Sequence, residues 1–497
     1  MADIKEYCGV FGIFNSPNAA GSIYYGLHAL QHRGQESCGI VTSTFDKAKS
    51  KKVMRVYKDF GLVLDVFSNP AVFEDKLLGS SGIGHNRYST SGSPDNRSNI
   101  QPFVVSYRDG NIAIAHNGNL SNARELRRSF SDRGTLFQTT TDSELILHLI
   151  AQSRRRKQID QILDALSQIE GAYSVAILTD DHLIAARDPN GFKPLALGRI
   201  QSVDGNGTTA YCVASETCAF DMIKAEYVRD IEPGEVLVID RKGCATGKFA
   251  SHHLTQRYGT SQCVFEFVYF SRPDSKIFGA NVDKVRRKIG KQLAHDAPVP
   301  VVKDGKKPVV IAVPDSSNTA ALGFVSECIK MGLDCKYEIG FIRNHYVGRT
   351  FIAPGQDNRE QRVRCKFNTV DGVLKDRVVV IVDDSIVRGT TARFLVDMVL
   401  EAGAAEVHFR VASPPVVNPC YYGMDFPDPE ELLANQYERS IDAMREWLGV
   451  KSLSYLSVDG MMEAVHSSTG SKGFCNACFS GNYPVPVEHG VTKEEYD

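Results

Sequence analysis

The sequence predicts two domains of different fold class: an α+β domain with a mainly antiparallel sheet, then an α/β domain with a doubly wound parallel sheet. A length of 497 residues is too great for one ordinary domain. Between residues 8 and about 240, short β-branched and aromatic runs such as CGVFGIF, FVVSY and GEVLVI alternate with turns rich in Gly, Asn and Asp. From about residue 280, apolar runs such as KPVVIAVP and DRVVVIVDDS alternate with helical segments, which is typical of a parallel sheet.

The composition excludes several classes of function. The chain has 57 Lys+Arg against 59 Asp+Glu, a net charge of −2, which argues against a general nucleic-acid-binding protein. No stretch approaches the roughly 18 unbroken apolar residues of a membrane span, and MADIKEYCGVFGIF lacks the pattern of a secretory signal. We therefore expect a cytoplasmic protein with no nucleic-acid or membrane partner, whose 12 cysteines do not form structural disulfides.

One helix of the first half is well defined by its pattern. SELILHLIAQSRR (143–155) places Leu145, Ile146, Leu149 and Ile150 on one face. Thr141 and Glu144 have the spacing of a capping box at its start.

A candidate phosphate site lies in the second half, in VVVIVDDSIVRGTT (378–391). Ligands of open α/β sheets bind at the carboxyl ends of the strands, where Asp383 and Asp384 leave the strand together. The loop that follows supplies N–H groups and hydroxyls at a helix N-terminus, which suits a phosphate, and the carboxylates suit sugar hydroxyls or Mg²⁺. The alternatives are a turn, a helix cap or a Walker B element. The last fails because no G-x-x-x-x-G-K-[ST] occurs, and no G-x-G-x-x-G follows a strand.

The same segment resembles the phosphoribosylpyrophosphate (PRPP) loop of type I phosphoribosyltransferases. The resemblance implies that Asp383 and Asp384 face the ribose hydroxyls, and that a loop binds the 5′-phosphate through Ser385, Arg388, Gly389, Thr390 and Thr391. RNHYVGRTFIAPGQDNREQRVRCKFN (343–368) resembles the mobile loop that closes over PRPP, excludes water and places Lys366 on the pyrophosphate. Arg343-Asn344-His345-Tyr346 departs from the Lys-Asn-Arg-Tyr more common in the family, which leaves its contacts open.

Five motifs follow one another in the first half: CGVFGIF, LQHRGQES, HNRYST, HNGNL and TTTDSE. Singly, Cys8 could be a core cysteine, Asn117-Gly118 a type I′ turn and Asp142 a helix cap. Together they resemble the class II glutamine amidotransferase domain, an N-terminal-nucleophile αββα sandwich. The resemblance implies that Asn117 and Gly118 form the oxyanion hole, and that Arg87 and Asp142 hold the α-carboxylate and α-amine of glutamine.

The chemistry of a glutaminase explains the position of Cys8. Acyl transfer through a thiolate divides a difficult amide hydrolysis into easier steps, and a terminal α-amine, with a pKa of about 7.7–8.0, can serve as the general base. Cys8 combines both roles only as the first residue of the mature chain. We therefore expect Met1–Tyr7 to be a propeptide, which intact-mass measurement would detect if it remained on the active enzyme.

Cys475-x-x-Cys478 in FCNACF suits zinc or an iron–sulfur cluster, and the spacing decides neither the metal nor the other ligands. Reduced cysteines without a metal are the alternative. The segments CVFEFVYFSRPDS (263–275), SPPVVNPCYYGMDF (413–426) and CNAC resemble the cluster-bearing subgroup of amidophosphoribosyltransferases, which also has a short propeptide. The resemblance implies a [4Fe–4S] cluster on Cys263, Cys420, Cys475 and Cys478, and the seven cysteines other than these and Cys8 are expected to be packing residues.

The resemblance to this family covers the whole chain. It implies that PRPP, glutamine and water yield 5-phosphoribosylamine, glutamate and pyrophosphate, the first committed step of purine biosynthesis, with ammonia passed between two sites. It further implies Mg²⁺ near Ser317, Asp383 and Asp384, a homotetramer, and feedback inhibition by AMP- or GMP-type nucleotides. The expected parts are a propeptide (1–7), a glutaminase domain (8–245), a phosphoribosyltransferase domain (246–450) and a C-terminal segment with cluster ligands (451–497).

Two other functions are alternatives to this one. Another class II amidotransferase, such as a glucosamine-phosphate synthase, is contradicted by the PRPP loop. A non-enzymatic PRPP-sensing regulator would need a basic DNA-binding module, which the net charge of −2 does not indicate.

Overall fold

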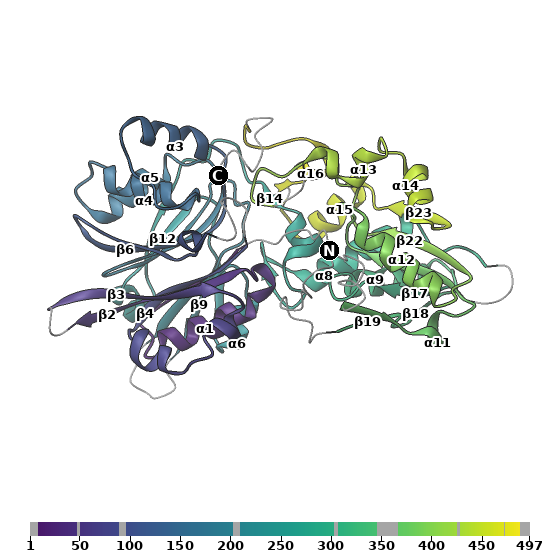
Figure 1. The fold of residues 1–497 in the computed structure, drawn as a ribbon, viewed down its shortest axis with the longest axis horizontal. Coiled ribbons are helices and arrows are strands. Elements are labelled where there is room, and N and C mark those ends of the chain that lie inside the picture. Colours follow the sequence, from purple (N-terminus) through teal and green to yellow (C-terminus); the bar gives the residue numbers. More distant parts are fainter. Residues whose placement is uncertain are drawn as a thin grey trace, which may run out of the picture.

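The computed structural model describes residues 8–46, 50–88, 96–201, 209–302, 307–344, 366–424, 428–471 and 473–487. Two halves, each built around its own sheets, lie side by side (Figure 1). Among the helices of these residues, none combines the length and apolar character needed to span a membrane.

The first half contains two antiparallel sheets. The seven-stranded sheet has the order β11-β9-β10-β1-β4-β2-β3 and the six-stranded sheet the order β13-β12-β8-β7-β6-β5. Their strands are β1 (Gly9–Phe14), β2 (Ser37–Asp46), β3 (Lys51–Phe60), β4 (Ser81–Arg87), β5 (Phe103–Tyr107), β6 (Gly110–Leu120), β7 (Gly171–Thr179), β8 (Leu183–Arg187), β9 (Ala196–Ile200), β10 (Ala210–Ala214), β11 (Glu226–Asp230), β12 (Glu235–Ile239) and β13 (Ala250–His253).

Helices cover the outer face of each of these sheets. Figure 1 shows α3, α4 and α5 over the six-stranded sheet and α1 and α6 under the seven-stranded sheet, which confirms the predicted αββα sandwich. The helices are α1 (Ala19–Ala29), α2 (Val63–Val66), α3 (Ala123–Asp132), α4 (Ser143–Gln152), α5 (Gln158–Leu166), α6 (Cys218–Met222) and α7 (Arg241–Thr246).

Strand β1 shows why the layers stack in this way. Its side chains alternate between two faces: Val10 and Phe14 belong to the core between the two sheets, whereas Phe11 and Ile13 belong to the core that includes α1. Because both faces of β1 are covered, all of its residues are buried.

The capping box predicted at the start of α4 is wrong. The N-cap residue is Asp142, and its side chain makes no capping hydrogen bond. The carboxylate of Glu144 instead accepts hydrogen bonds from the backbone N–H groups of Gln138 and Thr139, each at 2.8 Å. The carboxylate of Glu144 thus binds the loop before α4 and does not cap the N-terminus of the helix, as the sequence pattern predicted.

The second half contains a parallel five-stranded sheet of order β18-β17-β21-β22-β23, as predicted. Because the strand order reverses between β17 and β21, the carboxyl ends of these two strands lie at a topological switch point. The strands are β17 (Val309–Ala312), β18 (Lys336–Tyr337), β21 (Val378–Asp383), β22 (Glu406–Val411) and β23 (Ser452–Tyr455). The helices are α8 (Val282–Asp296), α9 (Asn318–Lys330), α11 (Asp371–Leu374), α12 (Thr390–Glu401), α13 (Leu433–Gln436), α14 (Ile441–Leu448), α15 (Val458–Thr469) and α16 (Ala477–Ser480).

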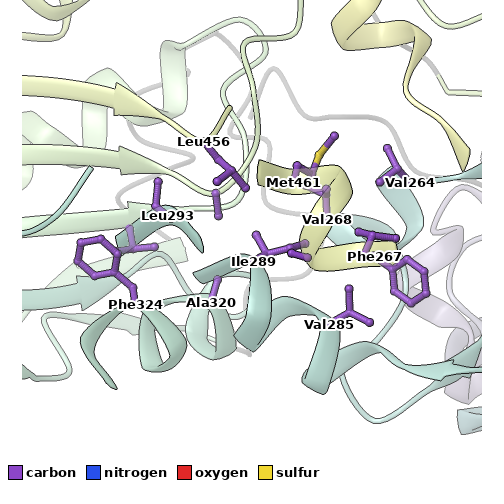
Figure 2. Close-up of a cluster of buried hydrophobic side chains, with 14 of the residues drawn as sticks. Val264, Phe267, Val268, Val285, Ile289, Leu293, Ala320, Phe324, Leu456 and Met461 are labelled. Atoms are coloured by element: carbon purple, nitrogen blue, oxygen red, sulfur yellow. The ribbon is translucent and has the colours of Figure 1, made fainter. Parts of the chain in front are cut away.

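Both faces of this sheet are covered by helices. Val310 and Val380 belong to a core that includes residues of α8, α9 and α15, part of which Figure 2 shows. Val309 and Val379, the preceding residues of the same strands, belong to a second core with residues of α12 and α14. This alternation is the doubly wound arrangement that the sequence predicts.

Two of the predicted segment boundaries, after residues 245 and 450, separate strands that pair with each other. Strand β13 (Ala250–His253) pairs with β12, so the six-stranded sheet extends past residue 245. Strand β23, from the segment 451–497, pairs with β22 and completes the parallel sheet.

Helices α8 and α9 pack unusually closely because each has a glycine at the contact. A Cβ atom on Gly290 would lie 1.9 Å from the carbonyl oxygen of Ala320, and one on Gly323 would lie 2.1 Å from that of Arg287. Figure 2 shows the neighbouring apolar contacts, from Ile289 and Phe324 among others. The two backbones are therefore in direct contact.

The substitution Gly290→Ala should lower the free energy of unfolding by about 1–3 kcal/mol, because the added methyl group overpacks this contact. The measurement is the midpoint of thermal and urea unfolding. Gly372→Ala on α11 is the control, since a Cβ there meets nothing within 4 Å, and it should be neutral or stabilising by up to about 1 kcal/mol. Equal midpoints for the two variants would contradict the close packing.

Candidate active sites and cysteine cavity

The candidate nucleophile Cys8 lies directly before β1 and is 6% exposed. Its thiol donates a hydrogen bond to the carbonyl oxygen of Tyr88 at 3.4 Å. Burial raises the pKa of this thiol to about 11, against a smaller lowering by that hydrogen bond and by the charge of Arg87. The thiol is therefore protonated near neutral pH and needs a base to react as a thiolate.

The candidate oxyanion hole lies within strand β6, so the alternative of a type I′ turn at Asn117-Gly118 is wrong. Gly118 has a φ of +155°, and a Cβ there would lie 1.9 Å from the carbonyl oxygen of Ala172. The side chain of Asn117 is fully buried, and neither its oxygen nor its nitrogen has a hydrogen-bond partner among the described residues. Since an unpaired buried amide costs free energy, this side chain is poised for a ligand.

Two charged side chains flank Cys8. Arg87, at the end of β4, is 2% exposed, and its guanidinium lies 3.9 Å from the carboxylate of Glu36. Asp142 accepts a hydrogen bond from the Leu120 N–H at 2.9 Å. Burial raises the pKa of Asp142, but His116 and the hydrogen bonds outweigh it, so that its pKa lies below the usual value. A cation and an anion thus both act on the thiol through their charges, and such a pair suits a zwitterion such as glutamine.

The predicted roles of Arg87 and Asp142 remain predictions. The alternative that Asp142 is only a helix cap finds no support, because its side chain makes no capping bond. Glu36 was not predicted, although it lies in the LQHRGQES motif.

The acidic pair of the second half lies at the end of β21, where it meets the loop that follows β17. The Ser317 hydroxyl oxygen lies 3.0 Å from Asp383 Oδ1 and 3.2 Å from Asp384 Oδ2, and Ser316 donates to Asp384. Burial raises the pKa of both carboxyls, and the charge of Asp384 raises that of Asp383 further. Two adjacent buried carboxylates with a serine hydroxyl form a set of hard oxygen donors that fits Mg²⁺.

The loop after the acidic pair leads directly into α12. Ser385 is buried and donates to Asp384 at 2.8 Å, and Gly389, with a φ of +77°, occupies the N-cap position. Thr390 and Thr391 are the first two residues of the helix. Arg388 forms an ion pair with Glu431 at 2.5 Å, a partner that the sequence pattern did not indicate.

Residues 345–365, with His345 and Tyr346, lie outside the described part of the predicted mobile loop. The two flanks of the loop form an antiparallel pair, β19 (Phe341–Arg343) and β20 (Phe367–Thr369). The Asn344 N–H donates to the carbonyl oxygen of Lys366 at 2.8 Å. The loop therefore begins and ends at one place, and the contact of Lys366 with pyrophosphate remains a prediction.

The four predicted cluster cysteines line one cavity, together with Phe192, Tyr422, Met424, Ala477 and Tyr483. Cys263 of β14 (Gln262–Cys263) and Cys475 of β24 (Phe474–Cys475) are partners in a parallel pair, and Cys420 accepts a hydrogen bond from the Tyr422 N–H at 3.4 Å. Burial raises the pKa of all four thiols. Four thiols around one cavity, from two buried and two partly buried cysteines, fit a metal centre, since a cation would stabilise them as thiolates.

Zinc and an iron–sulfur cluster would bind these four thiols in different ways. In the described residues, no three His, Cys, Asp or Glu side chains are grouped so as to hold a single metal ion. One zinc ion would draw four sulfur atoms to about 2.3 Å from a common centre, whereas a [4Fe–4S] cluster binds each cysteine at a different iron.

Sequence reasoning did not find the groups that complete the wall of this cavity. The ring of Phe192 stacks on that of Tyr422, with centroids 4.3 Å apart. The next residue, Lys193, is fully buried. Burial lowers its pKa to about 8, and the charges of Cys263, Cys420 and Cys475 act against that lowering. Of the other cysteines, six are buried as expected, namely Cys38, Cys212, Cys218, Cys244, Cys328 and Cys335, and Cys365 lies outside the described residues.

Comparison with known proteins identifies the family. A family model described as a glutamine amidotransferase domain matches residues 85–221. The chain is 46% identical over 490 residues to amidophosphoribosyltransferase 1, chloroplastic, of Arabidopsis thaliana, covering 98% of this chain and 81% of that protein. It is 43% identical over 493 residues to the amidophosphoribosyltransferase of Bacillus subtilis, covering 98% and 96%. The chain belongs to the amidophosphoribosyltransferase family.

Solved structures agree with this assignment to the amidophosphoribosyltransferases. The glutamine PRPP amidotransferase from Bacillus subtilis complexed with ADP and GMP has a TM-score of 0.85 at 42% identity, covering 99% of this chain and all of that one. A structure described as the allosteric regulatory enzyme of purine biosynthesis also has a TM-score of 0.85, at 43% identity and 98% coverage of both chains. The chain is therefore a glutamine-dependent PRPP amidotransferase of purine biosynthesis, and the predicted function is confirmed.

Alkylation of Cys8 should reveal its protonation state. In the chain that retains Met1–Tyr7, the rate with iodoacetamide should rise about tenfold per pH unit between about pH 7 and pH 10, because the thiol has a raised pKa of about 11. In the chain that begins at Cys8, the rate should level off above about pH 8, where the free α-amine can take the thiol proton. Peptide mass spectrometry measures both rates, with the fully buried Cys212 as an unreactive control. Levelling near pH 8 in the longer chain would contradict the raised pKa.

Proposed function

We propose that the first half releases ammonia from glutamine at Cys8 after cleavage behind Tyr7. The support is the buried thiol with a raised pKa, which needs a nearby base such as the α-amine that cleavage would create. Asn117 and Gly118 stabilise the oxyanion of the tetrahedral intermediate. Arg87 and Asp142 orient the α-carboxylate and the α-amine of glutamine.

In the second half, Asp383 and Asp384 accept hydrogen bonds from the ribose hydroxyls of PRPP, and the loop of Ser385, Arg388, Gly389, Thr390 and Thr391 holds the 5′-phosphate. Lys366 contacts the pyrophosphate. Ser317, Asp383 and Asp384 hold Mg²⁺, which neutralises charge on the pyrophosphate leaving group when it is bound. Ammonia attacks C1 of the sugar as the bond to pyrophosphate breaks, with inversion at that carbon.

The main support for ammonia release in the first half and its use in the second is a direct contact between the halves at β6, the strand that contains Asn117 and Gly118. The Asn119 side-chain amide donates to the carbonyl oxygen of Tyr421 at 2.9 Å. A Cβ on Gly423 would lie 3.2 Å from the carbonyl carbon of Gly118. Ammonia released at Cys8 therefore forms next to the second half, which supports its passage between the sites without escape to solvent.

We further propose that Cys263, Cys420, Cys475 and Cys478 hold a [4Fe–4S] cluster that fixes the C-terminal segment, and that the enzyme is a homotetramer in the cytoplasm. The Arabidopsis relative is named as chloroplastic. Purine nucleotides of the AMP or GMP type act as feedback inhibitors that compete with PRPP. The support for this last proposal is the related Bacillus subtilis enzyme, which was crystallised with ADP and GMP.

Asp384→Asn tests the phosphoribosyl site. The variant should lower kcat/KM for PRPP about 10- to 100-fold in the reaction with ammonium, because hydrogen bonds to a charged group contribute about 1.5–3 kcal/mol. Asp397→Asn is a matched control on α12, where Asp397 is partly exposed and pairs with Arg393 of the same helix, and it should retain the parent value. An unchanged kcat/KM in Asp384→Asn would remove Asp384 from the site.

Metal analysis of the protein purified without oxygen tests the cysteine site. We expect about four iron and four sulfide per chain, with broad visible absorption. Cys475→Ser should lose most of the iron, and Cys244→Ser, which changes a buried cysteine outside the cavity, should retain it. A colourless protein with about one zinc per chain would contradict the cluster.

A further inference from the structure

Two cysteines that have no role in the reaction lie together at the C-terminal end of α9. Cys328 is in the last turn of the helix and is fully buried, and Cys335, just before β18, is 4% exposed. The chain turns back between them: the Leu333 N–H donates to the Cys328 carbonyl oxygen at 3.0 Å, and Gly332 has a φ of +81°. The other end of α9 follows Ser317, beside the acidic pair, so the length of the helix separates the two cysteines from that site.

The side chains of these two cysteines interact directly. Both belong to the apolar core that includes Phe324 and Val310, and the Cys335 thiol donates a hydrogen bond to the Cys328 sulfur. This hydrogen bond lowers the pKa of Cys328 against the opposing effect of burial, and it raises the pKa of Cys335. Cys328 is therefore the member of the pair that ionises first.

A buried cation also acts on Cys328. Arg410 of β22 is 5% exposed, and its guanidinium donates to three backbone carbonyl oxygens and to the Ser452 hydroxyl, at 2.9–3.1 Å. Among the described residues, these acceptors are all neutral. Burial lowers the pKa of Arg410 to about 10, and the charge of the Cys328 thiolate acts against that lowering. Because a buried cation is costly without a compensating charge, Arg410 favours the thiolate form of Cys328.

Two further groups influence the ionisation of Cys328, in opposite directions. The Val299 N–H donates to its sulfur and lowers its pKa, whereas the carboxylate of Glu327, the preceding residue, raises it. The charge of Glu327 is itself paired, with Lys330 at 3.2 Å and with His295 at 3.4 Å. The pKa of Cys328 therefore lies below its ordinary value, which is the property of a reactive cysteine.

The two cysteines are buried, but residues next to them in the chain are exposed. Ile329 and Met331 follow Cys328 and are exposed at the end of α9, and the exposed Asp334 precedes Cys335. The end of a helix opens locally at a much smaller free-energy cost than unfolding of the whole chain. A small uncharged oxidant can therefore reach the sulfur atoms while the chain stays folded.

We propose that Cys328 and Cys335 are a redox-active thiol pair that hydrogen peroxide converts into a disulfide. The Cys328 thiolate attacks one peroxide oxygen, the O–O bond breaks and a sulfenic acid forms, while the departing hydroxide takes the Cys335 proton and leaves as water. The Cys335 thiolate then attacks the Cys328 sulfur, the S–S bond forms and the S–O bond breaks, and the second hydroxide leaves as water with a proton from solvent. Two electrons thus pass from the two sulfurs to the peroxide, and a small dithiol restores both thiols.

Peptide mass spectrometry of the full processed chain tests this pair. Trypsin cuts after Lys330, between the two cysteines, so that the disulfide joins two peptides that separate again after treatment with dithiothreitol. In excess hydrogen peroxide near pH 7, the pair should oxidise at least about tenfold faster than Cys212 and Cys244, because the rate follows the thiolate fraction. These two cysteines are the internal controls, since burial raises the pKa of both.

Four variants separate the contributions to the reactivity of the pair. Arg410→Met removes the buried charge and should slow oxidation about tenfold, which corresponds to about one unit in the pKa of Cys328, and Arg410→Lys should restore part of the rate. Glu327→Gln removes the charge that raises the pKa and should increase the rate by up to about threefold. Cys335→Ser keeps a hydroxyl donor but no second thiol, so peroxide should leave a sulfenic acid on Cys328 that dimedone labels.

Circular dichroism recorded before and during oxidation distinguishes reaction of the folded chain from reaction after unfolding. The proposal is overturned if the folded parent forms no disulfide between Cys328 and Cys335, or forms it only after unfolding in urea. Equal rates in the parent and in a folded Arg410→Met also overturn it. If Arg410→Met does not fold, a slower oxidation in Glu327→Gln, or no dimedone label in Cys335→Ser, has the same meaning.

Discussion

One buried guanidinium group joins the two halves of this enzyme. Arg33, from the segment before β2, pairs with Glu216 of the first half and with Glu266 of the second. The charge of Arg33 holds the pKa of Glu216 far below its usual value, although burial alone would raise it. Removing one partner from such a buried set typically costs about 3–5 kcal/mol, because the other charge is left unpaired. Separation of the halves would therefore break this set and expose the charges of Arg33, Glu216 and Glu266 to water.

Both active sites also depend on contacts between segments that lie far apart in the chain. Cys8, Asn117 and the pair Asp383–Asp384 are all buried, and each needs a neighbour that only the correctly packed chain supplies. Asp384 takes hydrogen bonds from serines that follow another strand. The contact of Gly423 with Gly118 places the second half against the oxyanion strand of the first. Chemistry and packing at the junction thus depend on the same residues.

The sequence could predict what short-range patterns determine. Alternating apolar residues give the strands, and VVVIVDDSIVRGTT gives both the end of β21 and the start of α12. It could not predict partners far apart in the chain: Ser316 is 68 residues from Asp384, and Arg33 is 233 residues from Glu266. The capping box failed for a local reason, because the backbone N–H groups of the loop five and six residues before Glu144 took its carboxylate. Of the cysteine site, the CxxC spacing indicated two ligands, and the other two came from resemblance alone. Phe192 and Lys193 could not be foreseen, since Arg187 fixes their loop through the carbonyl oxygens of Gly191 and Lys193.

The parallel pairing of Cys263 with Cys475 has a consequence for biosynthesis. The cavity takes one thiol from residue 263, one from residue 420 and two from residues 475 and 478. During translation, the strands of both large sheets of the first half and of the parallel sheet have all been made before the last of these thiols leaves the ribosome. A metal group that binds all four thiols could therefore be completed only after both halves have been synthesised.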